Sequence, residues 1–184
     1  SAFDNVTVFK NSATGNGGNI YNVPSATMTL ANTVVGGGTG GTGADIDNAG
    51  SITSGDYNII QTAPAGNALT GTTTHDLYTD PKLMPLSSNG GPTFTNADTS
   101  ASPGRQHIPF SGSSCGSITI EQDQRGFNRG SGNLCDSGAY EYAGVATAIV
   151  HRPLPKRVWR HRLAHDVSIA LPHVKRMEVN LKPF

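Results

Sequence analysis

A pattern that returns at a nearly constant interval constrains the fold of this 184-residue chain more than any other feature. Asn5, Asn32 and Asn58 stand at equivalent places in three short strand-like segments and are almost evenly spaced. A second pattern keeps the same interval, because Gly18-Asn19-Ile20-Tyr21-Asn22 returns as Ala44-Asp45-Ile46-Asp47-Asn48. A period of about 26 residues in β-type units is typical of a solenoid, in which each coil buries its apolar face by stacking on its neighbours. The sequence therefore predicts an all-β fold of stacked parallel coils.

The coils are expected over residues 1–79. Stacking would place Asn5, Asn32 and Asn58 above one another as an internal amide ladder, which assigns them a structural role. The linkers between the strand-like segments are rich in Gly and Thr, as expected where a coil turns corners. The sequence opens with no signal peptide, and Ser1 directly precedes a strand-like pattern. We therefore expect coils N-terminal to this stretch.

From Asp80 onward the pattern changes to closely spaced prolines and glycines, which end strand pairing and reverse the chain. A stack of coils needs a cap over its open end, and residues 80–144 are predicted to form an irregular β-rich cap. Cys115 and Cys135 both lie in this region. We expect a disulfide between them and therefore an oxidising compartment, with reduced buried cysteines as the alternative.

Charge and glycine content divide the chain near residue 144. Residues 1–144 hold five basic and eleven acidic residues, whereas 145–184 hold eight basic and two acidic ones, and all 23 glycines lie at or before Gly144. Charged residues make up only 14% of the chain, against about 25% in an average soluble protein. Soluble intracellular enzymes seldom have this composition, whereas secreted β-rich proteins often do. Residues 145–184 are therefore a separate basic C-terminal segment for attachment or assembly.

Several short motifs follow one another along the chain: Gly17-Gly18-Asn19-Ile20-Tyr21-Asn22, Asn32-Thr33-Val34-Val35, Tyr57-Asn58-Ile59-Ile60, Asp80-Pro81-Lys82-Leu83, Asn89-Gly90-Gly91-Pro92-Thr93, Asp123-Gln124-Arg125-Gly126 and Cys135-Asp136-Ser137-Gly138-Ala139-Tyr140-Glu141. In this order they resemble the C-terminal region of choice-of-anchor Q type surface proteins. The resemblance covers residues 3–142 and implies a right-handed parallel β-helix, a secreted or cell-surface location and no established catalytic residues. One departure is Ser102-Pro103-Gly104-Arg105-Gln106, where the family tends to have Ser-Pro-Ala-Ile-Asp.

The stretch from Asp123 to Tyr142 gathers residue types that often carry chemistry. Paired carboxylates with an arginine would suit a polysaccharide lyase or a glycoside hydrolase, and parallel β-helices host both. The alternative is structural, with Arg125 forking onto Asp136 or Glu141 beside the disulfide. We favour the structural interpretation and predict no catalytic residue.

Metal and cofactor sites are not indicated. The acidic residues of the coil region lack a calcium-loop motif, so calcium is only a weak alternative for Asp45, Asp47, Asp56, Asp76 and Asp80. His75 and His107 stand alone among turn residues and are expected to be exposed. His161 and His165 have the spacing of zinc ligands but lack the Glu of a His-Glu-x-x-His motif. We predict no metal site and no cofactor.

The basic segment supports two structures. Trp159, Leu163, Val167 and Leu171 fall four apart, which favours an amphipathic helix. Apolar residues also alternate from Val167 to Leu171 and from Met177 to Leu181, which favours strands. In either case the predicted partner-binding residues are Trp159, Leu163, Val167, Ile169, Leu171, Met177, Val179 and Leu181.

These features predict a secreted or cell-surface structural or adhesive protein that joins an extracellular filament through its C-terminal segment. The expected partners are other copies of the chain or a cell-surface component, since a single tryptophan among the basic residues argues against nucleic acid. No apolar run approaches the length of a membrane span. The alternatives are the lyase or hydrolase and a non-catalytic glycan-binding module, for which Tyr21, Tyr57 and Tyr78 are the available aromatics.

Overall fold

The structure of the protein is a computed structural model, which describes residues 1–110, 115, 122–130, 134–142 and 145–146. The chain divides into two compact units, Ser1–Ala148 and Ile149–Phe184. The second unit lies outside the described residues, and so do the predicted partner-binding residues of the basic segment. Every regular element in the described part is a β-strand, which confirms the all-β class there.

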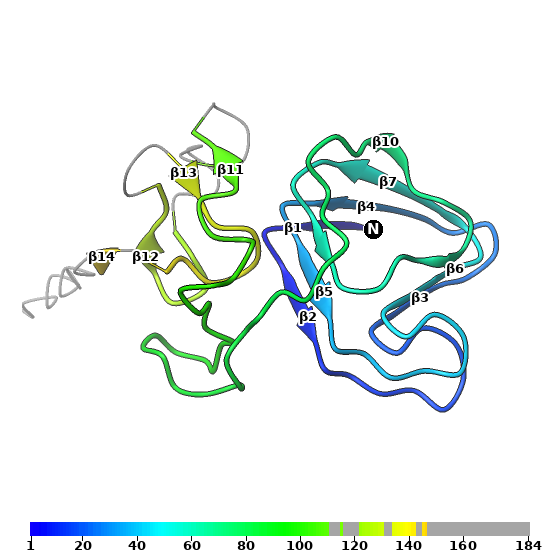
Figure 1. Cartoon of the computed structure of the whole chain (residues 1–184), viewed down its shortest axis with the longest axis horizontal. Coiled ribbons are helices and arrows are strands. Elements are labelled where there is room, and N and C mark those ends of the chain that lie inside the picture. The colour runs from blue at the N-terminus through cyan, green and yellow to red at the C-terminus, as the bar shows by residue number, and fades with distance from the viewer. Residues whose placement is uncertain (111–114, 116–121, 131–133, 143–144, 147–184) are drawn as a thin grey trace, which may run out of the picture. The chain divides into compact units, whose positions relative to one another are not determined.

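The first ten strands form three parallel sheets (Figure 1). The first sheet has the order β1 (Ala2–Asp4), β4 (Thr27–Ala31), β7 (Ser51–Gly55), β10 (Thr70–Thr72). The second has the order β2 (Thr7–Phe9), β5 (Val34–Gly36), β8 (Ile59–Ile60). The third has the order β3 (Ile20–Asn22), β6 (Ile46–Asn48), β9 (Ala65–Gly66).

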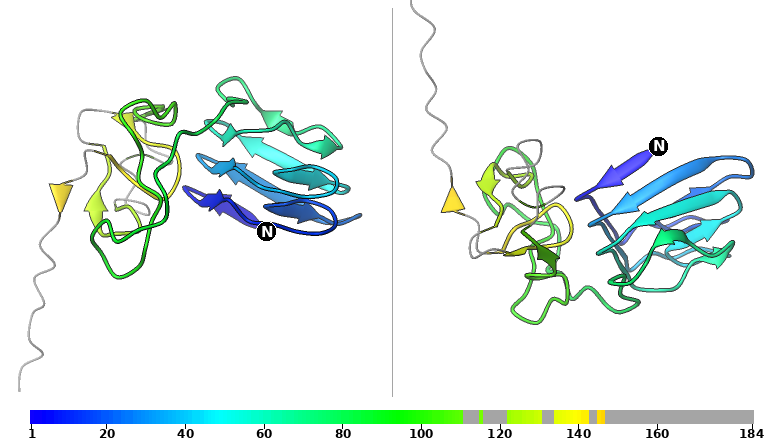
Figure 2. Two further views of the ribbon diagram at one scale, coloured as in Figure 1. Left: turned by 60° about the horizontal axis from the view of Figure 1, so that its bottom comes forward. Right: turned by 90° about the horizontal axis from the view of Figure 1, so that it is seen from above.

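The chain visits the three sheets in turn, so each pass adds one strand to each sheet until β10 returns to the first. Thr7 pairs with Val34, 27 residues later, and Ile20 pairs with Ile46, 26 residues later. The separation then shortens, because Thr53 lies only 17 residues before its partner Thr70. Figure 2 shows the strands of successive passes lying above one another. The predicted parallel stacking and its period are confirmed for the first passes.

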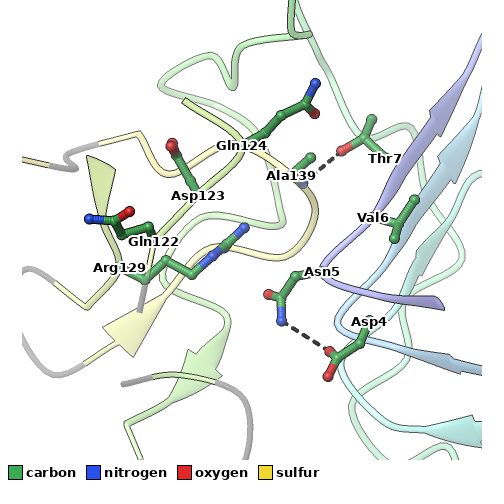
Figure 3. Close-up of a pocket in the computed structure, with 9 residues that line it drawn as sticks. All are labelled: Asp4, Asn5, Val6, Thr7, Gln122, Asp123, Gln124, Arg129 and Ala139. Carbon is green, nitrogen blue, oxygen red and sulfur yellow. Dashed lines mark hydrogen bonds between the residues drawn. The ribbon is translucent and has the colours of Figure 1, made fainter. Parts of the chain in front are cut away.

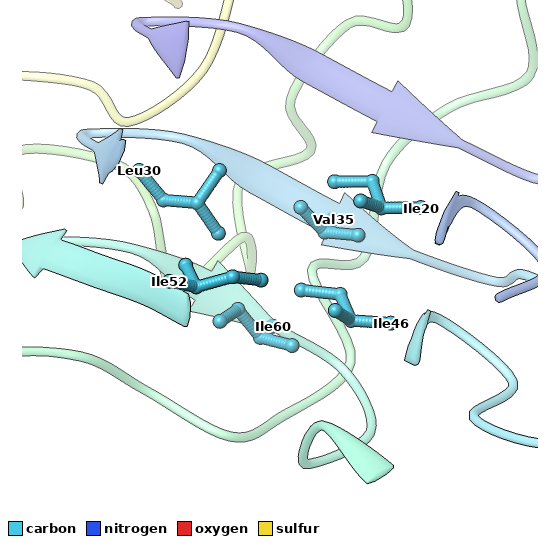
Figure 4. Packing of buried hydrophobic residues seen from close by; sticks show 6 residues of the cluster. All are labelled: Ile20, Leu30, Val35, Ile46, Ile52 and Ile60. Carbon is cyan, nitrogen blue, oxygen red and sulfur yellow. The ribbon is translucent and has the colours of Figure 1, made fainter. Parts of the chain in front are cut away.

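The core lies between the sheets and is built from aligned apolar residues (Figure 4). In β7 the burial alternates, so Ile52 points inward between two exposed neighbours. Val35 and Ile60 are paired on adjacent strands and are both fully buried. Burying one such side chain stabilises the fold by about 1.5–3 kcal/mol. Stacked β-branched residues therefore stabilise the packing of successive passes against one another.

The predicted ladder of Asn5, Asn32 and Asn58 needs a correction of register. Asn5 and Asn32 occupy equivalent turns with φ of 54° and 51°, but the third residue at this place is Tyr57, with φ of 58°. Asn58 instead lies beside Thr33, whose backbone N–H donates to the Asn58 side-chain oxygen over 3.0 Å. The cause is that the second step between strands spans 25 residues, one fewer than the alignment of the asparagines assumes.

A direct amide ladder is present on the third sheet, where the sequence predicted only the repeat. The Asn22 Nδ2 donates to Asn48 Oδ1 over 2.8 Å, and Asn48 Nδ2 donates to the carbonyl oxygen of Asn67 over 2.9 Å. Directly before β3 and β6, Asn19 Nδ2 donates to Asp45 Oδ1 over 2.9 Å. These side chains bond from one pass to the next and so hold the passes in register.

Pairing becomes antiparallel after the three sheets end. Strand β11 (Ile108–Pro109) pairs with β13 (Leu134–Cys135), and β12 (Phe127–Asn128) pairs with β14 (Val145–Ala146). The predicted disulfide between Cys115 and Cys135 is confirmed, with Cα atoms 5.6 Å apart. The boundary was predicted at residue 144, but strand β14 lies just beyond it and pairs with β12. Strand pairing in the C-terminal antiparallel region therefore extends to Ala146.

The segment Ser137–Ala139 binds along the turns of three successive passes. The Ala139 N–H donates to Thr7 Oγ1 over 2.9 Å, and the Gly138 N–H donates to the Asn32 carbonyl over 2.7 Å. The Ser137 hydroxyl donates to the Tyr57 carbonyl over 2.8 Å. These contacts run along the side of the stack, whereas the sequence interpretation placed this region over its end.

Candidate functional site: the buried ion pairs and the pocket beside Arg129

Arg125 is held by Asp123 rather than by the two carboxylates that the sequence suggested. Its Nε and Nη2 lie 2.9 and 2.6 Å from Asp123 Oδ2, and Nη2 also donates to the Glu141 carbonyl over 2.7 Å. The local turn explains the correction, because Asp123 Oδ1 accepts the backbone N–H of Arg125 and Gly126 follows with a φ of 85°. This turn brings the side chains at i and i+2 together.

Two aromatic rings lie against the Arg125 guanidinium. Its central carbon lies 4.1 Å from the Phe127 ring centroid and 3.7 Å from that of Tyr140. The Arg125 side chain is only 5% exposed and the Asp123 side chain is not exposed at all. A desolvated pair in which two guanidinium nitrogens donate to one carboxylate oxygen fixes geometry, and removing one partner is costly because the other charge stays buried.

Asp136 and Glu141 tie the backbone together. Asp136 accepts the Gln106 N–H at 2.7 Å with Oδ1 and the Tyr142 N–H at 2.6 Å with Oδ2. Glu141 Oε2 accepts the Asp136 N–H over 3.0 Å. Both residues are 2% exposed. These carboxylate oxygens accept hydrogen bonds from backbone donors and so connect segments of the region to one another.

Arg129 is the residue that the sequence interpretation overlooked. Its Nη1 lies 3.6 Å from Glu141 Oε2, and the guanidinium donates to the carbonyl oxygens of Asp136 and Gly138 over 3.1 and 2.7 Å. Residues 1–144 contain five basic residues against eleven acidic ones. The small number of basic residues could have drawn attention to Arg129, because buried carboxylates need the few cations that lie near them.

The charges of this region are strongly perturbed by burial. Desolvation, with the charge of Asp136 adding to it, raises the pKa of Glu141 to about 7. Asp98 lies in the same region, and burial together with the Asp136 charge raises its pKa to about 8. Asp98 Oδ2 makes no hydrogen bond within the described part of the chain. Burial also lowers the pKa of Arg129. The raised pKa values of Asp98 and Glu141 are typical of carboxyl groups buried in a protein with few hydrogen-bond donors around them.

A pocket of about 350 Å³ opens beside Arg129 (Figure 3). It lies between the first turn of the stack and the 122–139 region, and it is lined by Asp4, Asn5, Val6, Thr7, Gln122, Asp123, Gln124, Arg129 and Ala139. Arg129 is 6% exposed, and its Nε has no hydrogen-bond partner among the described residues. The pocket thus has an exposed polar rim, while the Arg129 side chain itself is only 1% exposed.

His75 and His107 do not stand alone, which corrects the sequence expectation, although His75 is exposed as expected and His107 is half-buried. The His75 ring stacks on Tyr57 with centroids 4.7 Å apart, and the His107 ring meets Tyr57 edge-on at 5.4 Å. His75 Nδ1 lies 2.7 Å from Asp56 Oδ2, with the His75 side chain 52% exposed. Burial, followed by the charge of His75, lowers the pKa of His107. The cluster joins the third pass to the residues before β11.

The acidic residues considered for calcium mostly accept N–H groups. Asp45 accepts from Gly38 and Thr62, and Asp76 Oδ1 accepts from the backbone and side chain of Asn58. No group of three or more His, Cys, Asp or Glu side chains is placed to hold a metal ion in the described ranges. His161 and His165 lie outside these ranges.

No protein-family model, curated protein or solved structure matches this chain. Within the part of the chain that the structure describes, no helix has the length and hydrophobicity needed to cross a membrane. What the protein does is therefore inferred from its own residues and their contacts.

Proposed function

We propose that the protein is a secreted or cell-surface structural or adhesive protein, built as a right-handed parallel β-helix with a disulfide-tied C-terminal region that packs along the side of the stack. The observation that carries this proposal is the cyclic visiting of three parallel sheets with partners 26 to 27 residues apart. A chain that winds in this way presents long flat faces and repeats along one axis, which suits a rod-like scaffold.

The outer face of the first sheet supports a surface role. Its outward side chains are uncharged and hydroxyl-bearing on three adjacent strands, and all of them are exposed: Thr27, Thr29, Ser51, Thr53, Thr70 and Thr72. A sheet face made mainly of hydroxyl-bearing side chains stays solvated and resists unspecific association. The disulfide between Cys115 and Cys135 fits an oxidising compartment outside the cytoplasm.

The buried ion pairs also favour a scaffold over an enzyme. Asp123 and Asp136 were the carboxylates that a lyase or hydrolase would use, and they are 6% and 2% exposed. Their oxygens accept hydrogen bonds from Arg125, Gln106 and Tyr142. Carboxylates engaged in this way hold loops in place, whereas a general acid or base must reach the proton that it transfers.

Attachment or assembly through residues 145–184 completes the proposal. This segment carries eight basic and two acidic residues, whereas residues 1–144 carry five and eleven. The opposite charges favour docking of the segment on another copy of the chain, where alternating apolar residues from Val167 to Leu181 would add a strand to an exposed sheet edge. The same complementarity would serve attachment to an acidic cell-surface component.

Electron microscopy of the purified full chain and of a chain lacking residues 150–184 tests assembly. We expect filaments or end-to-end particles from the full chain and single particles from the truncated one. A triple variant Val167→Ser, Ile169→Ser, Leu171→Ser should also stop assembly. The matched control Ser168→Ala, Ala170→Ser alters the intervening positions and should assemble normally. Unchanged assembly or surface retention after the truncation would refute the proposed role of the segment.

A further inference from the structure

The outer face of the first sheet carries hydroxyl groups in rows that run across neighbouring strands (Figure 1). Thr29 on β4 pairs with Thr53 on β7, and Thr53 pairs in turn with Thr70 on β10. A second row is formed by Thr27 and Ser51, which pair on β4 and β7. All of these residues are exposed. We call Thr27, Thr29, Ser51, Thr53 and Thr70 the threonine face.

The fold fixes the distances between the hydroxyl groups of the threonine face. Neighbouring strands lie about 4.8 Å apart, and alternate residues of one strand lie about 6.6 Å apart. On the inner side of β4 and β7, Leu30 and Ile52 are fully buried and hold the two strands in place. Threonine is β-branched and has few rotamers, so its hydroxyl group keeps its position. The Oγ1 atoms of Thr53 and Thr70 lie 3.4 Å apart, as expected for neighbours in one row. The face is therefore a small rigid grid of groups that both donate and accept hydrogen bonds.

The strands of the first sheet offer little to an ionic or a protein partner. Asp4 is the single charged residue of β1, β4, β7 and β10, and its Oδ1 already accepts from the amides of Asn5 and Asn32. The one aromatic residue of these strands, Phe3, packs against the core. A protein interface depends on buried aromatic or arginine anchors, which this face lacks. A sugar ring would also find no aromatic surface to lie against.

The surface of ice has the properties that the threonine face requires of a partner. It is uncharged, it repeats in two dimensions, and its water molecules both donate and accept hydrogen bonds. Ice and liquid water carry the same groups, so a single hydroxyl group cannot distinguish them. A rigid grid can, because its hydroxyl groups meet lattice oxygens together only where the spacing repeats. The oxygen atoms of ice repeat at distances similar to those between neighbouring strands and between alternate residues of a strand. Weak contacts that form together in this way reinforce one another.

We propose that the threonine face binds the surface of ice crystals, with Thr29, Thr53 and Thr70 as its central row. This activity adds to the structural or adhesive role proposed above and does not involve residues 145–184. The described C-terminal region leaves the face open, because Ser137–Ala139 binds the turns of the passes and not the first sheet.

Ice recrystallisation in the presence of the purified full chain tests this proposal. A frozen film held just below its melting point coarsens with time, and a protein bound to the crystals slows the growth of the grains. We expect the mean grain area to be at least about threefold smaller than with serum albumin at equal mass concentration, because several contacts form at once. A fluorescently labelled full chain should also concentrate in growing ice, whereas labelled albumin should stay in the liquid.

Variants locate the binding. Thr53→Lys places a long charged side chain at the centre of the face and should abolish the effect on grain area. Thr29→Lys should do the same, and it decides the question if thermal melting shows that Thr53→Lys does not fold. Both positions are exposed, so the two variants should melt close to the temperature of the unchanged chain. Thr62→Lys makes the same change at an exposed threonine in the linker after β8 and should leave the effect intact.

Grain growth that the full chain does not slow, or equal slowing by the folded lysine variants, would overturn the proposal. Sedimentation with crystalline cellulose and with chitin separates ice from a polysaccharide surface. We expect the full chain to bind neither. Binding to either polysaccharide that Thr53→Lys abolishes would also overturn the proposal, because the face would then recognise a glycan.

Discussion

The side-chain amide of Asn22 donates a 2.8 Å hydrogen bond to the side-chain oxygen of Asn48, which lies 26 residues later in the chain. Asn22 is 4% exposed and Asn48 is fully buried. The bond therefore joins two successive passes inside the protein, where water cannot replace it.

Replacing Asn48 by alanine should destabilise the protein by about 2 kcal/mol, because two hydrogen bonds between passes are lost and each contributes about 1 kcal/mol. The Asn22 amide keeps its contacts with the Ala26 and Ser51 carbonyls. Asn16→Ala alters an exposed asparagine and should change the free energy of unfolding by less than about 0.5 kcal/mol. Urea unfolding followed by circular dichroism measures both, and equal effects would contradict the ladder.

Gly17→Ala should destabilise the protein, whereas Gly15→Ala should not. Gly17 has a φ of +62°, and an added Cβ would overlap the carbonyl oxygen of Ile20. The left-handed conformation alone costs a residue with a side chain about 1–2 kcal/mol. At Gly15 an added Cβ would meet nothing within 4 Å. Thermal melting of the two variants checks the difference, and a stable Gly17→Ala protein would show that this turn is built differently.

Removing the disulfide should cost about 3 kcal/mol of stability, since it closes a loop between cysteines 20 residues apart. The measurement is denaturant unfolding of the chain with and without a reducing agent, together with the double variant Cys115→Ser, Cys135→Ser. The double variant should match the reduced protein and should not respond further to the reductant. A reductant effect on the double variant would mean that the loss has another origin.

Stability should fall as the pH rises between about 4.5 and 8, because burial raises the pKa of Asp98 from 3.8 to about 8 and that of Glu141 from 4.5 to about 7. In this window the folded chain therefore holds protons that the unfolded chain releases, so raising the pH favours unfolding. The contribution is complete below the ordinary carboxyl pKa and is lost once the pH passes the raised values.

Asp98→Asn isolates this effect, because an amide resembles the neutral acid. The variant should lose less melting temperature between about pH 5 and pH 8.5 than the unchanged chain. Asp80→Asn, at an exposed position, should keep the original pH dependence. If the melting temperature of the unchanged chain rises across this interval, Asp98 and Glu141 are not held in the neutral form.

The stacking was predictable because identical spacing recurs in sequence. Residues 18–22 and 44–48 align without a gap, and the strands formed within them pair in that register. The position of Asn58 was not predictable in the same way. When one pass is a residue shorter, Ile59 and Ile60 still fall on strand positions, so the apolar pattern does not change. Only the left-handed turn at Tyr57 shows that Tyr57, and not Asn58, is equivalent to Asn32.

The candidate site was less accessible to sequence reasoning. The turn-rich composition of the Asp123–Tyr142 stretch predicted a structural role for it. The partner of Arg125, however, depended on a turn that pairs it with Asp123 rather than with Asp136. The pocket joins segments far apart in the chain, as the 132-residue separation between Thr7 and Ala139 shows. Local sequence patterns do not predict which distant segments come into contact.

The stacking of successive passes is tested most directly by an engineered cross-link between them. Thr29 and Thr53 are paired on the adjacent parallel strands β4 and β7, and both are exposed. Neighbouring strands lie about 4.8 Å apart, within the Cα separation of about 4.4–6.8 Å that a disulfide spans. In the double variant Thr29→Cys, Thr53→Cys, mass spectrometry after mild oxidation should find this bond beside Cys115–Cys135. The control pair Thr27→Cys, Thr72→Cys, on strands that are not neighbours, should stay unlinked. A Thr29→Cys, Thr53→Cys protein that remains reduced, or a control pair that links equally fast, would contradict the stacked fold.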